Sequence, residues 1–354
     1  MLFREIFQND GVKEKFRTYV IAEIGQNHQG DMALAKRLIH RCAVAGADCV
    51  KFQKSDLKRK FTFSALDSPY DSENSFGSTY GEHKRHLEFS EEEFKELHAY
   101  ATECKIEFSA SAMDEVSLDF LVQLGLPFIK IGSGDTNNFP LLKKAAKAEQ
   151  PIILSTGMQQ ENTIRRAVDI ITGHNNSPLA ILHCVSGYPQ LANETNLSLI
   201  PKYREEFPNL IVGYSGHEEG TAITLAAVAL GAKIVERHVT LDKTIKGTDH
   251  KCSLLPEELK QLIQEIRTIE VAIGQPVKTI QTCEIPCKHK LGKTLVAARN
   301  LTTGDCIKES DINVKVSVPR GIEAEYIDEV IGKVCKTDIL EDSPIGWENL
   351  VYLN

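Results

Sequence analysis

Eight short apolar runs recur in the first 240 residues, and segments with helical periodicity separate them. Most of the runs are almost continuously apolar, as expected of parallel strands that are covered on both faces. In the intervening segments apolar residues fall at three- and four-residue spacing. Ser90 and Glu93 form a capping-box pattern before one such segment, and Pro256 opens the last. The runs are residues 19–25, 47–54, 107–113, 128–134, 151–157, 179–185, 211–217 and 233–239.

Eight alternating units in about 260 residues predict a TIM (β/α)8 barrel, which is an α/β fold. An open doubly wound sheet is the alternative. It receives less support, because the segment GSGDTN does not match GxGxxG and no dinucleotide fingerprint follows the first run.

The connection at residues 55–90 is too long for an ordinary loop of a compact domain. Its aromatic and basic residues favour an ordered lid over the barrel mouth, and a solvated surface insertion is the alternative. These residues are Lys58, Arg59, Lys60, Phe61, Phe63, Tyr70, Phe76, Tyr80, His83, Lys84 and Arg85.

The pattern changes near residue 275, where a mixed, proline-containing stretch is typical of a linker. From about Lys293, the short alternating runs TLVAARN and INVKVSV, with turn signals around them, predict a small β-rich domain. We therefore expect a barrel domain over residues 1–280, a linker over 281–292 and a second domain over 293–354. A domain of about 60 residues buries little surface on its own, so we expect it to dock against another surface.

The composition, 42% apolar and 25% charged, is that of a soluble globular protein. No apolar run approaches the ~20 residues of a membrane helix, and residues 1–16 do not resemble a signal peptide. The nine scattered cysteines favour reduced thiols and a cytoplasmic location. A net charge of −8 argues against nucleic-acid binding. It leaves an anionic small substrate possible, because local lysines can dominate one pocket.

Polar side chains gather at the predicted carboxyl ends of the runs, where TIM barrels carry their chemistry. Lysines and serines that meet there would bind a phosphate or a phosphorylated carboxylate, since ammonium groups supply charge and hydroxyls supply directional donors. The residues are Lys51, Ser109, Ser111, Lys130, Ser133, Ser186 and Ser215.

Two histidines, His217 and His238, lie at the ends of the seventh and eighth runs. In a closed barrel these strands adjoin the first, so both histidines and Glu23 would face one divalent Mn, Zn, Fe or Co ion. This co-location favours a metal-assisted enzyme that acts on a phosphorylated small molecule. The alternative is a non-catalytic or sugar-binding barrel, in which the histidines are structural and the lysines pair inside the barrel.

Several long motifs carry a resemblance to a known family. They are IAEIGQNHQGD, GADCVKFQKSD, KIGSGDTNNFP, GYSGHEEG and ERHVTLDKTIKGTDH. With them the chain resembles the sialic acid synthase family over essentially its whole length, and most closely the animal-type members. The tail, from LGKTLVAARNLTTGDCIKESDI onward, is similar to the antifreeze-like (SAF) domain that ends these synthases.

The resemblance implies a condensation of phosphoenolpyruvate with N-acetylmannosamine or its 6-phosphate, in which phosphate leaves by C–O cleavage. It assigns His217 and His238 to a divalent metal, most commonly Mn²⁺ with Mg²⁺ or Co²⁺ as alternatives, that acts as a Lewis acid. Glu23, Asp135 and Asp249 match catalytic carboxylates. The phosphoenolpyruvate site would comprise Lys51, Ser111, Lys130, Ser133, Ser186 and Ser215, with Tyr188 on the sugar side. The resemblance also implies a homodimer in which the SAF domain crosses to the partner subunit.

Two departures from the bacterial, free-sugar pattern favour the phosphorylated sugar. VKVSVPRG stands where those synthases carry an RPG-type arginine turn, so Lys315 or Arg320 takes that place. Ser186 and Asp135 stand where some bacterial relatives have Asn and Glu. The sugar phosphate would need extra positive charge, and His83, Lys84 and Arg85 of the lid are the candidates. A free-sugar synthase, a synthase of deaminated sialic acid from mannose 6-phosphate, and an inactive barrel with a binding SAF module remain as alternatives.

Overall fold

The computed structural model describes residues 3–6, 17–174 and 176–351 of the chain. The chain divides into two compact units, Met1–Gly274 and Gln275–Asn354. Most of residues 1–16, from which the absence of a signal peptide is predicted, lies outside the described residues.

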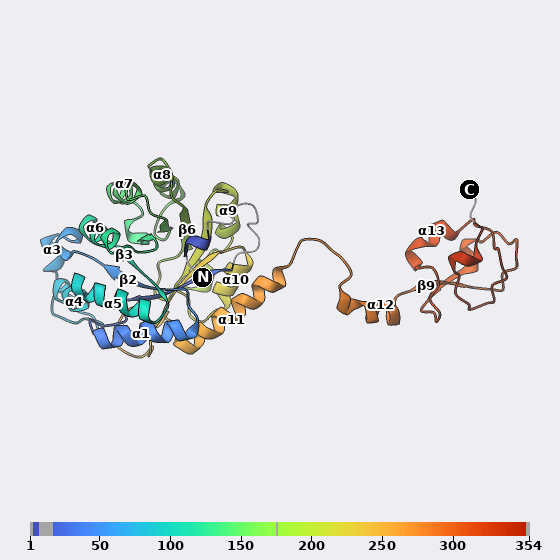
Figure 1. The fold of residues 1–354 in the computed structure, drawn as a ribbon, viewed down its shortest axis with the longest axis horizontal. Helices are drawn as coiled ribbons and strands as arrows, with labels where there is room; N and C mark the ends of the chain where they lie inside the picture. Colours follow the sequence, from blue (N-terminus) through green and yellow to red (C-terminus); the bar gives the residue numbers. More distant parts are fainter. Residues whose placement is uncertain (1–2, 7–16, 175, 352–354) are drawn as a thin grey trace. The chain divides into compact units, whose positions relative to one another are not determined.

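The first unit is a closed barrel of eight parallel strands in the order β1 to β8, which confirms the predicted TIM barrel (Figure 1). Pairing of Glu23 in β1 with His238 in β8 closes the barrel. The strands are β1 Tyr19–Gly25, β2 Cys49–Lys54, β3 Glu107–Ala112, β4 Ile129–Ile131, β5 Ile152–Ser155, β6 Leu179–Cys184, β7 Ile211–Gly216 and β8 Ile234–His238.

Most strands are shorter than the apolar runs that predicted them. The fourth run, residues 128–134, forms only the three-residue strand β4. The chain then turns at Gly132 into a 3-10 helix, η2 Ser133–Asp135. This turn lies at the carboxyl end of the barrel, where it presents Ser133 and Asp135.

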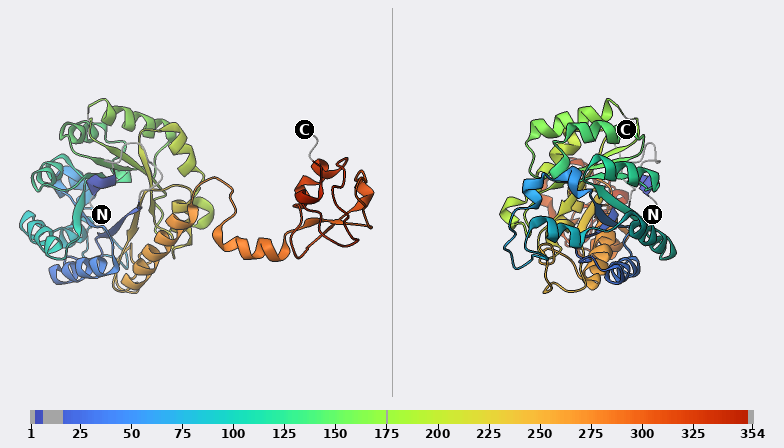
Figure 2. Two further views of the ribbon diagram at one scale, coloured as in Figure 1. Left: turned by 45° about the vertical axis from the view of Figure 1, so that its right-hand side comes forward. Right: turned by 90° about the vertical axis from the view of Figure 1, so that its left-hand side faces the viewer.

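Helices surround the barrel, and their apolar faces pack against the outward side chains of the strands (Figures 1 and 2). Ser90 caps its helix in the predicted capping box, and Pro256 occupies the first turn of the last helix. The helices are α1 Met32–Ala45, α5 Glu91–Glu103, α6 Glu115–Gln123, α7 Phe139–Lys147, α8 Glu161–Thr172, α9 Leu199–Glu206, α10 Ala222–Ala229 and α11 Pro256–Ile273, with the 3-10 helix η3 Ala192–Glu194 before α9.

The inward side chains change character along most strands, although those of β3, Glu107, Ser109 and Ser111, are polar throughout. Near the amino ends of the other strands they are apolar and form a second core with Phe3 of the 3-10 helix η1 Phe3–Ile6. Two residues later they become polar, so that Ile21 is followed by Glu23 and Ile234 by Glu236. Successive inward positions are two residues apart in a strand, so a layer of apolar side chains lies directly below a layer of polar side chains inside the barrel.

Residues 55–90 are ordered, as the lid prediction requires. They form α2 Leu57–Lys60, α3 Phe63–Leu66 and α4 Tyr80–Leu87, and Thr79 caps α4 in a full capping box. Tyr80 packs edge-on against Phe61 and Tyr70, with ring centroids 5.4 and 5.3 Å apart. These aromatic contacts hold the three short helices together.

The second unit has its own small core. Strands β9 Thr294–Ala297 and β10 Ile312–Lys315 pair antiparallel, and isolated bridges such as Leu301 to Ile339 extend the pairing. The other elements are η4 Thr282–Glu284, α12 Ile285–Leu291, η5 Glu309–Asp311, η6 Ala324–Tyr326, α13 Ile327–Val330 and η7 Trp347–Asn349. The segment predicted as a linker therefore contains a helix, α12.

All nine cysteines are free thiols. Among the helices that the structure describes, none has the length and apolar character needed to span a bilayer.

Candidate active site

A cavity of about 330 Å³ opens at the carboxyl ends of the strands. The barrel brings eleven of the predicted site residues together in its wall: Glu23, Lys51, Ser111, Lys130, Ser133, Asp135, Ser186, Tyr188, Ser215, His217 and His238. Lys60 and Phe61 of the lid line the same cavity. The eleven residues come from seven of the eight strands or from the segments that follow them, so only the closed barrel brings them together.

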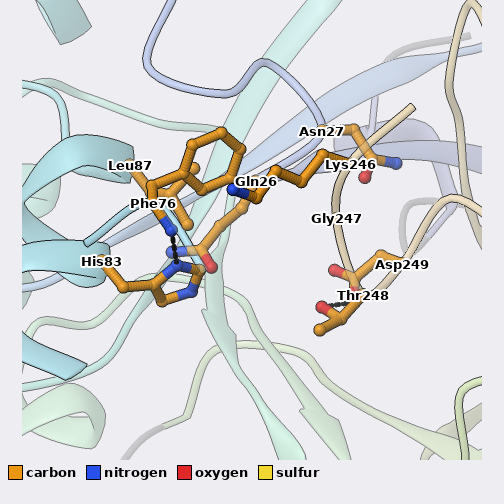
Figure 3. A pocket seen from close by; sticks show the side chains of 9 residues that line it. All are labelled: Gln26, Asn27, Phe76, His83, Leu87, Lys246, Gly247, Thr248 and Asp249. Atoms are coloured by element: carbon orange, nitrogen blue, oxygen red, sulfur yellow. Dashed lines mark hydrogen bonds between the residues drawn. The ribbon is translucent and has the colours of Figure 1, made fainter. Parts of the chain in front are cut away.

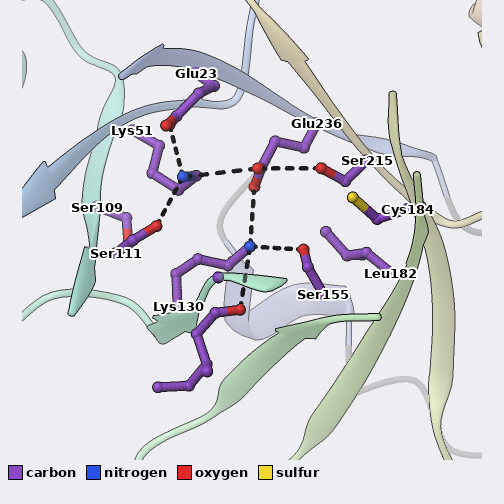
Figure 4. Close-up of polar contacts among 12 residues, drawn as sticks. Glu23, Lys51, Ser109, Ser111, Lys130, Ser155, Leu182, Cys184, Ser215 and Glu236 are labelled. Atoms are coloured by element: carbon purple, nitrogen blue, oxygen red, sulfur yellow. Dashed lines mark hydrogen bonds and ion pairs between the residues drawn. The ribbon is translucent and has the colours of Figure 1, made fainter. Parts of the chain in front are cut away.

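Two lysines and two glutamates form a buried charge network on the floor of the cavity (Figure 4). Lys51 Nζ lies 2.6 Å from Glu23 Oε2 and 3.6 Å from Glu236 Oε1. Lys130 Nζ lies 3.7 Å from Glu236 Oε2. When both glutamates are ionised, the four side chains carry two charges of each sign and balance one another.

Serine hydroxyls complete the contacts of this network (Figure 4). Lys51 donates to Ser111 Oγ over 3.0 Å, and Lys130 donates to Ser155 Oγ over 2.8 Å. Ser215 Oγ donates to Glu236 Oε1 over 3.3 Å. The hydroxyls and ammonium groups therefore form a single hydrogen-bonded surface that can bind an anionic ligand.

Burial and the neighbouring lysines together shift the pKa values of Glu23 and Glu236 in opposite directions. It raises the pKa of Glu23 to about 7, although Lys51 opposes the shift. Burial also tends to raise the pKa of Glu236, but Lys130 and Lys51 outweigh it and hold this pKa below the usual range. Glu23 can therefore exchange a proton near neutral pH, whereas Glu236 stays ionised.

His217 and His238 face each other across the cavity wall, with ring centroids 5.4 Å apart. His217 donates from Nδ1 to the Val185 carbonyl over 2.9 Å, which leaves its Nε2 open. His238 Nδ1 is buried without a hydrogen bond, and Asp249 Oδ2 lies 3.8 Å away. Burial lowers the pKa of His238 to about 4, so its imidazole is neutral at neutral pH.

Burial tends to lower the pKa of His217, but its contacts with Cys184 and the Val185 carbonyl outweigh burial and raise this pKa. The neutral His238 and the carbonyl partner of His217 fit a divalent cation, because metal-binding histidines commonly have such a hydrogen-bond partner behind the ring. Within the described residues, no three His, Cys, Asp or Glu side chains form a cluster that could hold a metal ion. The two histidines would therefore share such a cation with oxygen atoms of water or substrate.

The predicted sugar-side residues surround the histidines. The Tyr188 ring lies 4.2 Å from that of His217 and 6.0 Å from that of His238, between centroids. Asp135 lines the cavity from η2, and its carboxylate accepts a hydrogen bond from Asn138 Nδ2 over 3.3 Å. Tyr188 is 46% exposed, so it can contact a ligand in the cavity.

The other predicted residues do not line this cavity: Ser109, His83, Lys84, Arg85, Asp249 and Arg320. Of these, Asp249 and His83 line a smaller cavity. Lys84 lies beside it and donates to Gln26 Oε1 over 2.9 Å. Arg85 is exposed on α4. Arg320 belongs to the second unit, where its guanidinium donates to the carbonyls of Lys288, His289 and Gly292 at the end of α12.

Four further residues line the cavity without a role predicted from the sequence: Ser155, Cys184, Glu236 and Lys60. Of these, Glu236 was expected at the end of the eighth run and Lys60 in the lid. Ser155 and Cys184 are the inward residues that end β5 and β6, so counting inward positions from the strand ends would have found both. Glu236 carries the same signal on β8, two residues before His238. The sequence gives no such periodic signal for Lys60, because it lies on a lid helix.

Comparison with known proteins agrees with the geometry. Residues 38–278 match the NeuB family, and residues 292–351 match the SAF domain. The chain belongs to the NeuB family. The first match includes seven of the eight barrel strands and both histidines, so the family is defined over the part of the chain that forms the cavity.

Relatives cover almost the whole of this NeuB-family chain. N-acetylneuraminate-9-phosphate synthase from Homo sapiens is 49% identical over 330 residues, which are 93% of this chain and 92% of the relative. The enzyme of the same name from Drosophila melanogaster is 49% identical over 94% of this chain and 96% of its own. The N-acetylneuraminic acid synthetase structure from Leptospira borgpetersenii, in complex with citrate, has 34% identity and a TM-score of 0.67, over 78% of this chain and 93% of that one.

Proposed function

We propose that this chain is an N-acetylneuraminate-9-phosphate synthase. It would condense phosphoenolpyruvate with N-acetylmannosamine 6-phosphate and release inorganic phosphate. The observation that carries the proposal is the single cavity in which the charge network, the serines and the two histidines meet. The near-complete coverage of relatives with this name supports the choice of substrates.

Phosphoenolpyruvate would bind the lysine and serine surface on the cavity floor. Its carboxylate and phosphate can accept hydrogen bonds from ammonium and hydroxyl donors of Lys51, Ser111, Lys130, Ser133, Ser155, Ser186 and Ser215. The serines supply direction and the lysines supply charge. Since Glu23 and Glu236 balance the lysines before the ligand enters, the two lysines can stay buried in the empty site.

The sugar would bind above, with its open-chain aldehyde toward His217 and His238. A divalent cation held by these histidines, Mn²⁺ by preference, would polarise the aldehyde oxygen as a Lewis acid. Asp135, Tyr188 and Asp249 would hold the hydroxyl groups of the sugar. Arg320 stays a prediction for the sugar side.

The new C–C bond would form between the methylene carbon of phosphoenolpyruvate and the aldehyde carbon. This bond formation leaves the aldehyde oxygen as an alkoxide, and water adds to the cationic C2 of phosphoenolpyruvate. Glu23 takes one proton from that water, which its pKa of about 7 permits, and this proton ends on the alkoxide. The second proton of the water leaves with the phosphate. Collapse of the resulting intermediate breaks the bond between C2 and the bridging oxygen. That oxygen leaves with the phosphate, and the oxygen from water becomes the keto group.

Phosphate release with Mn²⁺ tests the proposal. N-acetylmannosamine 6-phosphate, N-acetylmannosamine and mannose 6-phosphate are compared as partners for phosphoenolpyruvate. We expect release with N-acetylmannosamine 6-phosphate and at most weak release with the free sugar. Turnover of free N-acetylmannosamine alone would replace the proposal with a free-sugar synthase, and no release with any sugar would favour a non-catalytic barrel.

We also propose a homodimer and a cytoplasmic location. Apolar side chains near the start of the second unit are exposed, among them Val277 at 67%, Ile280 at 56% and Leu291 at 63%. A second copy of the chain is the occupant that we propose for them. The free thiols suit a reducing compartment.

A further inference from the structure

Four lysines in or beside the cavity fall into two classes by their partners. Lys51 and Lys130 on the floor form ion pairs with Glu23 and Glu236. Lys60 on α2 and Lys84 on α4 belong to the lid, and neither has a carboxylate within ion-pair distance among the described residues. The lid therefore brings to the site two lysines that form no ion pair with a described residue, and Lys246 in the wall of the smaller cavity is a third such lysine.

The contacts of the two lid lysines are with neutral groups. Lys60 Nζ lies 2.7 Å from the Met113 thioether sulfur, which is a weak acceptor. Lys84 Nζ donates to Gln26 Oε1 over 2.9 Å and lies 5.4 Å from the centre of the Tyr80 ring. These contacts hold the ammonium groups in place without neutralising their charge.

Asp135 attracts Lys60 and Asp249 attracts Lys84, but in the described part of the chain neither carboxylate forms an ion pair with a lid lysine. Two further acidic side chains near the lid are engaged elsewhere. Glu88 pairs with Lys54 at 2.7 Å and accepts from the hydroxyl of Ser55 at 2.7 Å. Asp114 caps α6 and accepts from the backbone N–H groups of Val116 and Ser117. Glu88 and Asp114 could form an ion pair with a lid lysine only by losing these bonds. They therefore leave the positive charges of the lid lysines unpaired.

Tyr80 links the segments that carry the two lysines, because Lys84 Nζ lies 5.4 Å from the centre of its ring and Phe61, which follows Lys60, packs edge-on against the same ring with centroids 5.4 Å apart. Burial lowers the pKa of Lys84 to about 8, and the charge of Lys60 lowers it further in the same direction. Burial lowers the pKa of Lys60 as well. Two partly buried like charges without a counter-ion are unfavourable, and an anion placed between them would relieve the cost.

We propose that Lys60 and Lys84 form the subsite for the phosphate group of the sugar substrate. This inference rests on the proposed function. The phosphate carries nearly two negative charges at pH 7 and suits two ammonium groups. Lys60 lines the same cavity as His217 and His238, so one open-chain sugar can reach both ends.

The neighbouring space does not offer a second place for the phosphate. A smaller cavity lies between Gln26, His83 and Asp249 (Figure 3). It has about 20 Å³, which is room for roughly one water molecule. Arg85 has no ion pair with a described residue, but its side chain is exposed, whereas Lys84 is partly buried and contacts Gln26 in the wall of the smaller cavity.

Single substitutions test the subsite. Lys60→Gln and Lys84→Gln should each lower kcat/KM for N-acetylmannosamine 6-phosphate by about tenfold or more, because each removes one charge-assisted contact. The KM for phosphoenolpyruvate should change by less than about twofold, since the paired lysines of the floor are untouched. Lys58→Gln is the matched control, because Lys58 is exposed on the same helix as Lys60.

Calorimetric titration with N-acetylmannosamine 6-phosphate and Mn²⁺, without phosphoenolpyruvate, separates the subsite from the synthase reaction. We expect the wild type to bind and both lid variants to bind at least about tenfold more weakly. If binding follows this pattern but the wild type does not turn over, the subsite stands and the proposed synthase reaction fails. Unchanged binding in both lid variants, an equal rise in KM for phosphoenolpyruvate, or loss of phosphosugar use in Arg85→Gln instead would overturn the subsite.

Discussion

Gly157 leaves space for a ligand between two serines of the site. A methyl group on its Cα would lie 2.4 Å from Ser186 Oγ and 2.7 Å from Ser133 Oγ. Its backbone N–H also donates to Ser133 Oγ over 3.2 Å. Both hydroxyls would have to rotate away from such a methyl group, so the absence of a side chain here keeps the serine donors in place.

Gly157→Ala should therefore weaken phosphoenolpyruvate binding. We expect its KM to rise about tenfold or more as two neutral hydrogen-bond donors are displaced, while the KM for the sugar phosphate changes by less than about twofold. Steady-state kinetics with each substrate varied in turn measures both values. An unchanged KM for phosphoenolpyruvate would show that Ser133 and Ser186 do not bind it.

The segments that carry the two histidines are joined by a buried ion pair. Glu218 follows His217, Arg237 precedes His238, and Arg237 Nη1 lies 2.9 Å from Glu218 Oε1. Arg237 also donates to the Glu218 carbonyl and to Thr224 Oγ1. Both charged side chains are almost fully buried, so this pair ties the end of β7 to β8 on the outer side of the strands.

Glu218→Gln should lower the free energy of unfolding by about 3–5 kcal/mol, because it leaves the buried guanidinium without a counter-charge. Chemical denaturation of the full chain measures the change. Asp119→Asn is the matched control: it breaks the exposed pair with Lys144, where we expect a loss below about 1 kcal/mol. A loss for Glu218→Gln as small as that of the control would show that the ion pair between Glu218 and Arg237 does not stabilise the contact between the end of β7 and β8.

The sequence predicted the elements better than their ends. Eight apolar runs separated by helical segments were sufficient to predict the barrel. The two-residue period of a strand then predicted which strand residues face inward. They did not reveal that β4 ends at Ile131, since the turn into η2 depends on contacts such as that of Thr136 Oγ1 with the Ser155 carbonyl.

In the site, too, the positions that depend on contacts between distant segments could not be predicted from the sequence. The strand-borne residues could be predicted as a group, whereas the different positions of Lys84 and Arg85 could not. They are adjacent in sequence, and the helical geometry of α4 alone directs Lys84 to Gln26 and leaves Arg85 exposed. Lys60 was missed as a site residue for the same reason, because its contact with Met113 joins segments 53 residues apart.

At the scale of the molecule, the two units have separate hydrophobic cores. The barrel core and the apolar layer inside the barrel consist of residues before Gly274. The core around Leu295, Ile322 and Ile345 consists of residues after it. A unit with a core of its own can fold alone. The barrel therefore does not depend on the second unit for its folding.

A chain truncated after residue 280 should unfold cooperatively but lose turnover of the sugar phosphate, if the second unit contributes to the site as the resemblance implies. Circular dichroism and phosphate release measure the two properties.

Light scattering of the full chain should give a mass near twice 39.4 kDa. Full activity of the truncated chain would refute the contribution, and a full-length monomer would refute the homodimer.

If the cavity joins phosphoenolpyruvate to an aldehyde as proposed, the C–O bond of phosphoenolpyruvate is cleaved. Phosphoenolpyruvate labelled with ¹⁸O at the bridging oxygen tests it directly, in the presence of Mn²⁺ and N-acetylmannosamine 6-phosphate. Mass spectrometry should find the label in the released phosphate and none in the keto group of the product. Unlabelled phosphate, with the label retained on carbon, would mean P–O cleavage and would contradict the account.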